Sequence, residues 1–337
     1  MSIERARKAL KGEKTDRIPI WDIPYHAGFV KHYTGIDPVG DRCRPAIVAA
    51  MRKLDVDVGM GWVPPSLAQS PEDVEGWRNE STTLKDIFSY DPFKRSDIAG
   101  MSEADSFKQA LKEYEDDVKM YGDFAMPVGR TFTTLIHYAA EDLDWVEFLS
   151  ASVEEEDKVG FLLDRFEACS RKNIGAWLKT GIEIMVTHDD IAMNRGTITS
   201  PKWLRKNIFP RYERLFKMIK DTGRIHIFMT DGDYKAVAED LAALGPDGYF
   251  IDPPCVDPVW LSNVVGKDKI IFTGPAAALF MTGTPGQMRD EVKRMADAAK
   301  AEIPRFFFHA LGQIMVPGVP TENVVAYYDA VLEFGQR

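Results

Sequence analysis

Eight short apolar runs, spread along the chain and separated by helical segments, constrain the fold of this sequence most strongly. Each run is rich in Val, Ile, Phe or Tyr and is bounded by Gly, Pro or Asp, a pattern typical of buried parallel strands. The expected strands are Ile18–Trp21, Val56–Trp62, Phe124–Val128, Ile182–Thr187, Ile225–Met229, Gly248–Ile251, Lys269–Phe272 and Arg305–Phe308. Their alternation with helices predicts a parallel sheet covered by helices.

Several of the intervening segments carry helix start and stop signals. Ser200 offers a capping hydroxyl just before Pro201, and the helix that follows should end at Gly223 and kink at Pro210. Further helices with one apolar face are expected at Tyr234–Leu244, Pro285–Glu302 and Thr321–Phe334. These segments connect successive strands or close the chain.

The strand–helix repeats favour a closed (β/α)8 barrel, known as a TIM barrel, over an open doubly wound sheet. No glycine-rich dinucleotide loop is present, because the segment Gly59–Pro64 begins like GxGxxG but ends in proline. A barrel of this length forms one domain, so we expect a single domain over 1–337. The longest interruptions, Pro64–Asp123 and Tyr138–Gly181, should hold extra helices in the loops after strands two and three.

Charge and cysteine content exclude several classes of partner. The chain has 42 Lys and Arg against 52 Asp and Glu, a net charge of −10, so we expect neither nucleic acid nor a membrane as a partner.

The three cysteines are isolated and fit a reducing compartment. The charged amino terminus does not resemble a signal peptide, and no run of 18 apolar residues occurs. We therefore expect a soluble cytoplasmic protein, and a homodimer is compatible with the sequence.

Polar residues gather where the expected strands end, which is where (β/α)8 barrels place their active sites. We expect functional roles for Asp190, Asp231 and His309, because Asp and His seldom end apolar strands unless they are paired or used. Asp189 and Asp190 face opposite ways in an extended segment, so one enters the site and the other braces a helix or loop. The same reasoning predicts that Asp22 caps a turn and that His226 is a satisfied core histidine.

Three longer segments carry a family resemblance. THDDIAMNRGTITSPKWLRKNIFPRYERLFKMIK contains a strand ending in Asp, an N-x-G-x-x-x-S-P loop and a long helix. FMTDGDYKAVAEDLAALGPDGYFIDPP and HALGQIMVPGVPTENVVAYYDAV follow later in the chain. Together they resemble the uroporphyrinogen decarboxylase superfamily over nearly the whole chain. The resemblance implies a (β/α)8 barrel and two activities, decarboxylation and corrinoid-dependent methyl transfer.

Two departures from the family patterns separate these activities. The decarboxylases carry R-Q-A-G-R near the amino terminus, and this chain has Tyr25-His26-Ala27-Gly28-Phe29, without the arginines that would pair with substrate carboxylates. Thiol-methylating members bind zinc through H-x-C and a later Cys. The matching positions here are Met229-Thr230-Asp231 and Ala310-Leu311-Gly312, which contain no cysteine. Zinc is therefore not predicted; a different metal site among His137, His188, Asp190, Asp231 and His309 is left open, although no spacing in the sequence argues for it.

The resemblance therefore favours a methyltransferase that is the first component of an O-demethylase system. Such an enzyme moves a methyl group from a small donor, here an aryl methyl ether, to the cobalt of a corrinoid (cobalamin) held by a separate corrinoid-binding protein. The alternatives are a decarboxylase acting on uroporphyrinogen or another acid, and a non-catalytic barrel that binds a corrinoid or a small aromatic molecule. Each of these three candidate functions requires different residues in the site.

The methyltransferase interpretation assigns roles to particular residues. Asp190 and Asp231 are the expected acids or hydrogen-bond donors to the leaving oxygen, and His137 and His309 are expected to orient the methyl donor. The expected substrate-binding residues are Tyr25, His26, Trp62, Arg130, Met193, Asn194 and Met229.

Overall fold

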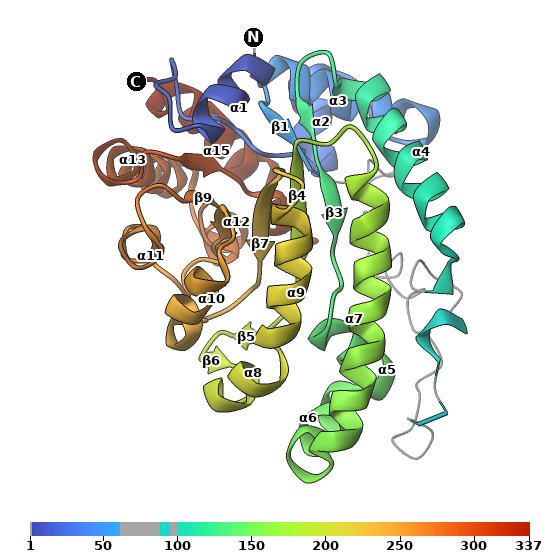
Figure 1. The fold of residues 1–337 in the computed structure, drawn as a ribbon. Coiled ribbons are helices and arrows are strands. Elements are labelled where there is room, and N and C mark those ends of the chain that lie inside the picture. Colours follow the sequence, from blue (N-terminus) through green and yellow to red (C-terminus); the bar gives the residue numbers. More distant parts are fainter. Residues whose placement is uncertain (1, 61–87, 90, 95–99) are drawn as a thin grey trace. The chain divides into compact units, whose positions relative to one another are not determined.

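A computed structural model describes residues 2–60, 88–89, 91–94 and 100–337 (Figure 1). These residues form two compact units, each built from separate stretches of sequence. The first unit contains the described residues before 61 together with Asp116–Val128 and Gly248–Arg337. The second contains Gly129–Asp247 and the described residues between 88 and 115. Helix α4 (Glu103–Tyr121) contributes residues to both.

The first unit is built on parallel strand pairs. Its strands are β1 (Val58–Gly59), β2 (Met126–Pro127), β8 (Gly248–Phe250), β9 (Ile270–Thr273) and β10 (Phe306–Phe308). β8 pairs with β9, β9 with β10, and β1 with β2, all in parallel. Ile20 and Trp21 join these pairs through parallel bridges to Phe308 and Val58. The indole of Trp21 stacks on Phe272 with ring centroids 4.9 Å apart, at the centre of this core.

The helices of the first unit lie mostly in its amino-terminal and carboxyl-terminal segments. They are α1 (Ser2–Leu10), α2 (Ala27–Thr34), η1 (Gly40–Arg42), α3 (Cys43–Lys53), α11 (Pro258–Val265), α12 (Ala277–Thr282), α13 (Pro285–Glu302), α14 (Leu311–Ile314) and α15 (Thr321–Phe334). α13 and α15 pack against each other. α13 begins with a capping box, in which Thr284 and Gln287 satisfy each other's backbone N–H groups.

The second unit is built on three parallel strands in the order β3, β4, β7. These are β3 (Gly129–Thr131), β4 (Ile184–His188) and β7 (Ile225–Met229), and a short antiparallel hairpin, β5 (Ala192–Met193) and β6 (Gly196–Thr197), follows β4. The helices are η4 (Pro92–Lys94), α5 (Ile136–Leu143), α6 (Trp145–Glu154), α7 (Glu156–Leu178), α8 (Pro201–Asn207), α9 (Phe209–Lys220), η6 (Lys235–Val237) and α10 (Ala238–Leu244). α7 and α9 cover the strands (Figure 1).

Most of the expected elements are confirmed, with differences that have local causes. The helix predicted from Ser200 begins there, with the Ser200 hydroxyl accepting from the Trp203 N–H, and it breaks at Ile208 before Pro210. Ile18–Trp21 is reduced to bridges, since Pro19 has no N–H to donate. The expected strand Phe124–Val128 is present only as β2 (Met126–Pro127), and neither β3 nor the β5–β6 hairpin was expected. Part of the predicted strand Val56–Trp62 lies outside the described residues.

The long interruptions hold extra helices, as predicted. α4 lies in the segment before Asp123, and α6 and α7 lie in the segment before Gly181. None of the helices in the described part of the chain combines the length and apolar character needed to cross a bilayer.

Candidate functional site

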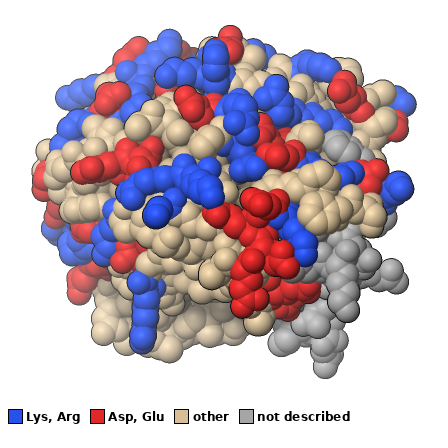
Figure 2. Space-filling view, turned by 60° about the horizontal axis from the view of Figure 1, so that its bottom comes forward, with Lys and Arg blue, Asp and Glu red and all other residues tan. Residues whose placement is uncertain are grey.

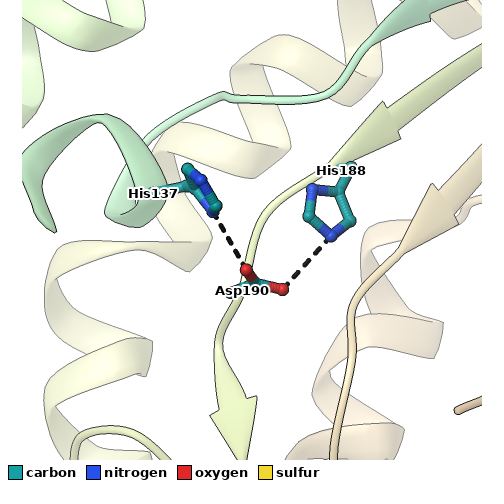
Figure 3. A group of neighbouring side chains, drawn as sticks. All are labelled: His137, His188 and Asp190. Atoms are coloured by element: carbon teal, nitrogen blue, oxygen red, sulfur yellow. Dashed lines mark hydrogen bonds and ion pairs between the residues drawn. The ribbon is translucent and has the colours of Figure 1, made fainter. Parts of the chain in front are cut away.

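Two histidines and an aspartate meet at the end of β4 (Figure 3). His188 is the last residue of β4, Asp190 follows two positions later, and His137 lies in the first turn of α5. Residues two apart in an extended segment point to the same side, which brings His188 and Asp190 together. The Nδ1 of His137 lies 2.9 Å from Oδ2 of Asp190, and the Nε2 of His188 lies 3.1 Å from Oδ1. We call these three residues the His–Asp–His cluster.

The other nitrogen of each imidazole faces an oxygen outside the cluster. The Nε2 of His137 lies 3.3 Å from Oε1 of Glu141, one turn further along α5. The Nδ1 of His188 donates a hydrogen bond to the backbone carbonyl of Phe132, 2.6 Å away. These contacts fix the orientation of both rings. The side chains of the cluster are partly exposed, with 29% of His137, 14% of His188 and 22% of Asp190 accessible to solvent.

The cluster strongly shifts the ionisation of its members. The hydrogen bond with Asp190, and then the contact with Glu141, raise the pKa of His137 to about 10. Burial opposes a charge on His188, but the contact with Asp190 outweighs it and raises the pKa of His188. Burial likewise opposes the charge on Asp190, yet the two histidines hold its pKa well below the usual range. Within this cluster Asp190 is a carboxylate acceptor, and its catalytic role stays a prediction.

Asp189 braces the helix that carries His137. Its Oδ2 accepts hydrogen bonds from the N–H groups of Leu135 and Ile136, and its Oδ1 accepts from the N–H of His137. The hydroxyl of Tyr212 on α9 donates to Oδ2 at 2.8 Å. The division of labour predicted for the adjacent aspartates is thus confirmed, with Asp190 in the cluster and Asp189 fully buried as the brace.

Asp231 lies close enough to His188 to act on it electrostatically. It is exposed and begins a tight turn after β7, in which Gly232 adopts φ +78° against the backbone of Met193. Met193 is 53% exposed, and Asn194 follows it in the turn of the β5–β6 hairpin. Met229, at the end of β7, is buried. These residues all belong to the second unit.

Two predicted substrate binders have their polar groups engaged by the protein itself. Arg130 is buried, pairs with Glu113 at 3.1 Å and lies over the ring of Trp177. His26 caps α2, with Nδ1 accepting from the Phe29 N–H and Nε2–H donating to the carbonyl of Val319. In both cases these contacts stabilise the fold, and a role of either residue in binding substrate stays a prediction.

His309, Asp22 and Tyr25 belong to the first unit. His309 is 2% exposed, donates from Nδ1 to the carbonyl of Trp21 and lies edge-on to Phe250 and Phe272. Burial lowers its pKa to about 4. Asp22 accepts from the N–H groups of Ile23 and Ala310, as expected for a cap. Tyr25 is half-buried. A catalytic role for His309 stays a prediction.

Sequence reasoning missed the partnership of His188 with Asp190. The available signal was the H-x-D spacing after a predicted strand, which places both side chains on one face. His226, in contrast, is a satisfied core histidine as predicted, buried with its Nε2 2.8 Å from the hydroxyl of Thr187. Trp62 lies outside the described residues.

Comparisons with known proteins bear on the fold and the family. Residues 76–334, more than half of the chain, match the family model described as uroporphyrinogen decarboxylase (URO-D). Among solved structures, a methyltransferase from Methanosarcina mazei matches with a TM-score of 0.70 and 16% identity, over 99% of this chain and 98% of that chain. No curated protein matches the sequence. Together the two matches confirm the predicted (β/α)8 fold class.

Proposed function

Since this chain belongs to the uroporphyrinogen decarboxylase family, we propose that within this family it is a methyltransferase of the corrinoid-dependent branch. The methyl donor is a small molecule in which the methyl group is bonded to oxygen, with aryl methyl ethers as the first candidates. The acceptor is the cobalt of a corrinoid carried by a separate protein. The observation that carries this proposal is the His–Asp–His cluster, which sets N–H groups at a partly exposed strand end.

The chemistry of ether cleavage explains why such a cluster is useful. A reduced corrinoid supplies the nucleophile that accepts the methyl group, so the methyl–oxygen bond breaks and both of its electrons stay on oxygen. An aryloxide is a poor leaving group unless a hydrogen bond or a proton reaches that oxygen as the bond breaks. The imidazoles of His137 and His188, whose pKa values are raised, would supply this proton or hydrogen bond once a ring nitrogen exchanges its present partner for the leaving oxygen. Asp190 keeps them oriented by accepting from His137 and lying against His188.

The decarboxylase alternative finds less support in the segment where that branch has its arginines. His26 uses both ring nitrogens within the protein. The two positions that carry arginine in the decarboxylases are Tyr25 and Phe29 here. The segment therefore offers no cation to a substrate that carries several carboxylates.

An apolar surface in the second unit favours a protein partner. Val146 and Val153 on α6 are 74% and 82% exposed, and Met193 of β5 is also exposed. A cavity of about 690 Å³ lies between α6, the β5–β6 hairpin and α8. Figure 2 brings forward the lower end of Figure 1, where α6 and α8 are drawn, and shows a broad uncharged area beside a group of acidic residues. Surfaces of this kind commonly mark docking sites.

The test is a direct assay of methyl transfer. The purified protein is incubated with reduced free cobalamin and a panel of methoxybenzoates and methoxyphenols, and methylcobalamin and the released phenol are measured together. We expect stoichiometric formation of both products, and loss of at least ten-fold in rate for His188→Gln. His32→Gln is the matched control, since His32 is exposed on α2. Carbon dioxide release from uroporphyrinogen would instead establish the decarboxylase. Saturable binding of the aromatic compound without turnover would support a non-catalytic barrel.

A further inference from the structure

When His188 is neutral and carries its proton on Nδ1, which donates to Phe132, the lone pair of Nε2 faces Oδ1 of Asp190. The Nε2 of His188 lies 3.1 Å from Oδ1 of Asp190, but the two are not aligned as a hydrogen bond. Oδ1 is buried and accepts no hydrogen bond from the described part of the chain. The other ring nitrogen of His188 already donates to Phe132. A buried carboxylate oxygen without a donor is costly, so a cation at this point would satisfy both atoms.

The outer contacts of both histidines match those of metal-binding imidazoles. A histidine that binds a metal through one nitrogen usually donates its other N–H to a backbone carbonyl or a carboxylate, which fixes the tautomer and the ring orientation. The Nδ1–H of His188 donates to the carbonyl of Phe132, and the Nε2 of His137 faces Glu141. The nitrogens that remain, Nε2 of His188 and Nδ1 of His137, both point toward Asp190.

The spacing of the inner atoms fits a small coordination sphere. Bond lengths of about 2.0–2.2 Å in a tetrahedral zinc site place neighbouring ligand atoms about 3.3 Å apart. The Nδ1 of His137 lies 2.9 Å from Oδ2 of Asp190, and the Nε2 of His188 lies 3.1 Å from Oδ1. One ligand atom from each of the three residues lies within 4.8 Å of the other two. Within the described ranges, these residues form a group of His, Cys, Asp or Glu side chains close enough to share one ion.

We propose that His137, His188 and Asp190 bind one divalent transition-metal ion, with two imidazole nitrogens and one carboxylate oxygen as ligands. This ligand set suits Zn²⁺ or Fe²⁺ and not Mg²⁺, which prefers oxygen ligands and water. The partial exposure of all three side chains leaves further coordination positions open to water or to a substrate oxygen. The ion takes the place of the proton between His137 and Asp190 and would polarise a leaving oxygen in the proposed reaction.

This site differs from the zinc site that the family resemblance implies for thiol-methylating enzymes. That arrangement needs cysteines at positions occupied here by Asp231 and by Ala310–Gly312, and those residues do not fit it. The proposed ligands come instead from the end of β4 and the start of α5. The inference concerns metal binding and does not depend on the identity of the reaction.

Metal binding by the full-length protein tests this proposal without any assay of activity. The protein is stripped with a chelator and titrated by calorimetry with Zn²⁺, Fe²⁺ under argon, and Mg²⁺, and Co²⁺ replaces Zn²⁺ for visible spectroscopy. We expect one Zn²⁺ per chain, a rise in Tm with added Zn²⁺, and the intense visible bands of low-coordinate Co²⁺. Mg²⁺ should show no saturable binding.

Single-residue variants identify the metal ligands, and circular dichroism of each variant separates a loss of binding from a loss of folding. His188→Gln, His137→Gln and Asp190→Asn should each weaken Zn²⁺ binding by at least ten-fold and abolish the Tm rise, whereas circular dichroism should show a folded chain. His32→Gln and Cys255→Ser are the controls, since an exposed histidine and the half-buried cysteine are the residues most open to adventitious zinc. Wild-type binding no tighter than that of the three ligand variants would overturn the proposal, even if methyl transfer were observed. Binding with no methyl transfer would contradict the proposed function alone.

Discussion

The hydroxyl of Tyr328 donates a hydrogen bond to Oδ2 of Asp22 at 3.0 Å, in a fully buried site that joins residues 306 positions apart. The same carboxyl group accepts from the N–H groups of Ile23 and Ala310. Burial nevertheless dominates these hydrogen bonds and raises the pKa of Asp22 to about 7. Asp22 therefore links the first strand segment to α14 and α15 and also makes the stability of this unit depend on pH.

Replacement of Asp22 by Asn should remove a pH-dependent part of the free energy of unfolding. The unfolded chain releases the Asp22 proton near pH 3.8, whereas the folded chain keeps it up to about pH 7. The contribution of Asp22 is thus complete below pH 3.8 and is lost as pH rises toward 7, at up to about 1.4 kcal/mol per pH unit. Urea unfolding of both proteins at several pH values between 4 and 8 measures the difference.

The pH dependence of Asp22 is measured by the difference in the free energy of unfolding between wild type and Asp22→Asn. Either protein alone would not give it, because other buried groups change the stability with pH in the opposite direction. Burial lowers the pKa of His226 to about 3 and that of His309 to about 4, so these residues destabilise the fold as pH falls below 6.5. Their effect is common to wild type and Asp22→Asn and cancels. A difference that does not change with pH would show that Asp22 is already ionised in the folded chain.

Tyr212→Phe should lower the free energy of unfolding by about 1–2 kcal/mol, because it removes one of four hydrogen bonds to the buried carboxyl group of Asp189. The control is Tyr33→Phe, since the hydroxyl of Tyr33 makes no hydrogen bond within the residues described. That change should cost less than about 0.5 kcal/mol. A double-mutant cycle with Asp189→Asn should show coupling between the two residues, and additive effects would contradict the contact.

The order of strands and the roles of adjacent aspartates were predictable from local pattern. Apolar runs located β4 and β7 of the second unit's sheet, whereas the run Phe124–Val128 ends just before β3 (Gly129–Thr131) and overlaps β2 of the first unit instead. The alternation of side chains in an extended segment separated Asp189 from Asp190. The β5–β6 hairpin was missed, although Asn194-Arg195-Gly196 between short β-prone segments is a recognised turn signal.

The composition of the site was harder to predict because it depends on contacts between distant segments. His137 and Asp190 are 53 positions apart, and their contact arises because Asp189 anchors the start of α5 beside the end of β4. Arg130 and His26 were selected because each follows an expected strand, and their partners in the structure, Glu113 and the carbonyl of Val319, are too far away in the sequence for spacing to predict them. A position just after a strand identifies a residue as a candidate for the site. The contacts of that residue with distant segments determine what its polar atoms do, and these contacts are not visible in the sequence.

Gly232→Ala should destabilise the protein by about 1–3 kcal/mol. Gly232 has φ +78°, and a Cβ there would lie 2.6–2.7 Å from the backbone of Met193. The adjacent hydrogen bond from the Asp233 N–H to the Met193 carbonyl, 2.8 Å long, would be strained as well. Gly160→Ala is the control, since Gly160 lies inside α7 with open space around it, and that change should be neutral or stabilising. Chemical unfolding compares the two, and equal effects would contradict a packing requirement at Gly232.

Asp231→Asn provides a sharp test of the predicted acid at the end of β7. If Asp231 donates a proton or a strong hydrogen bond to the leaving oxygen, the rate of methyl transfer should fall by about 10²-fold or more, while the donor concentration for half-maximal rate changes little. Asp233→Asn is the matched control, because Asp233 lies in the same turn and pairs with Lys235 at 3.1 Å. It removes the same charge two residues away and should leave the rate within a few-fold of wild type. Undiminished turnover by Asp231→Asn would reject its role as the acid and leave His137 and His188, whose ring nitrogens lie 2.9 and 3.1 Å from Asp190, as the donors to test next.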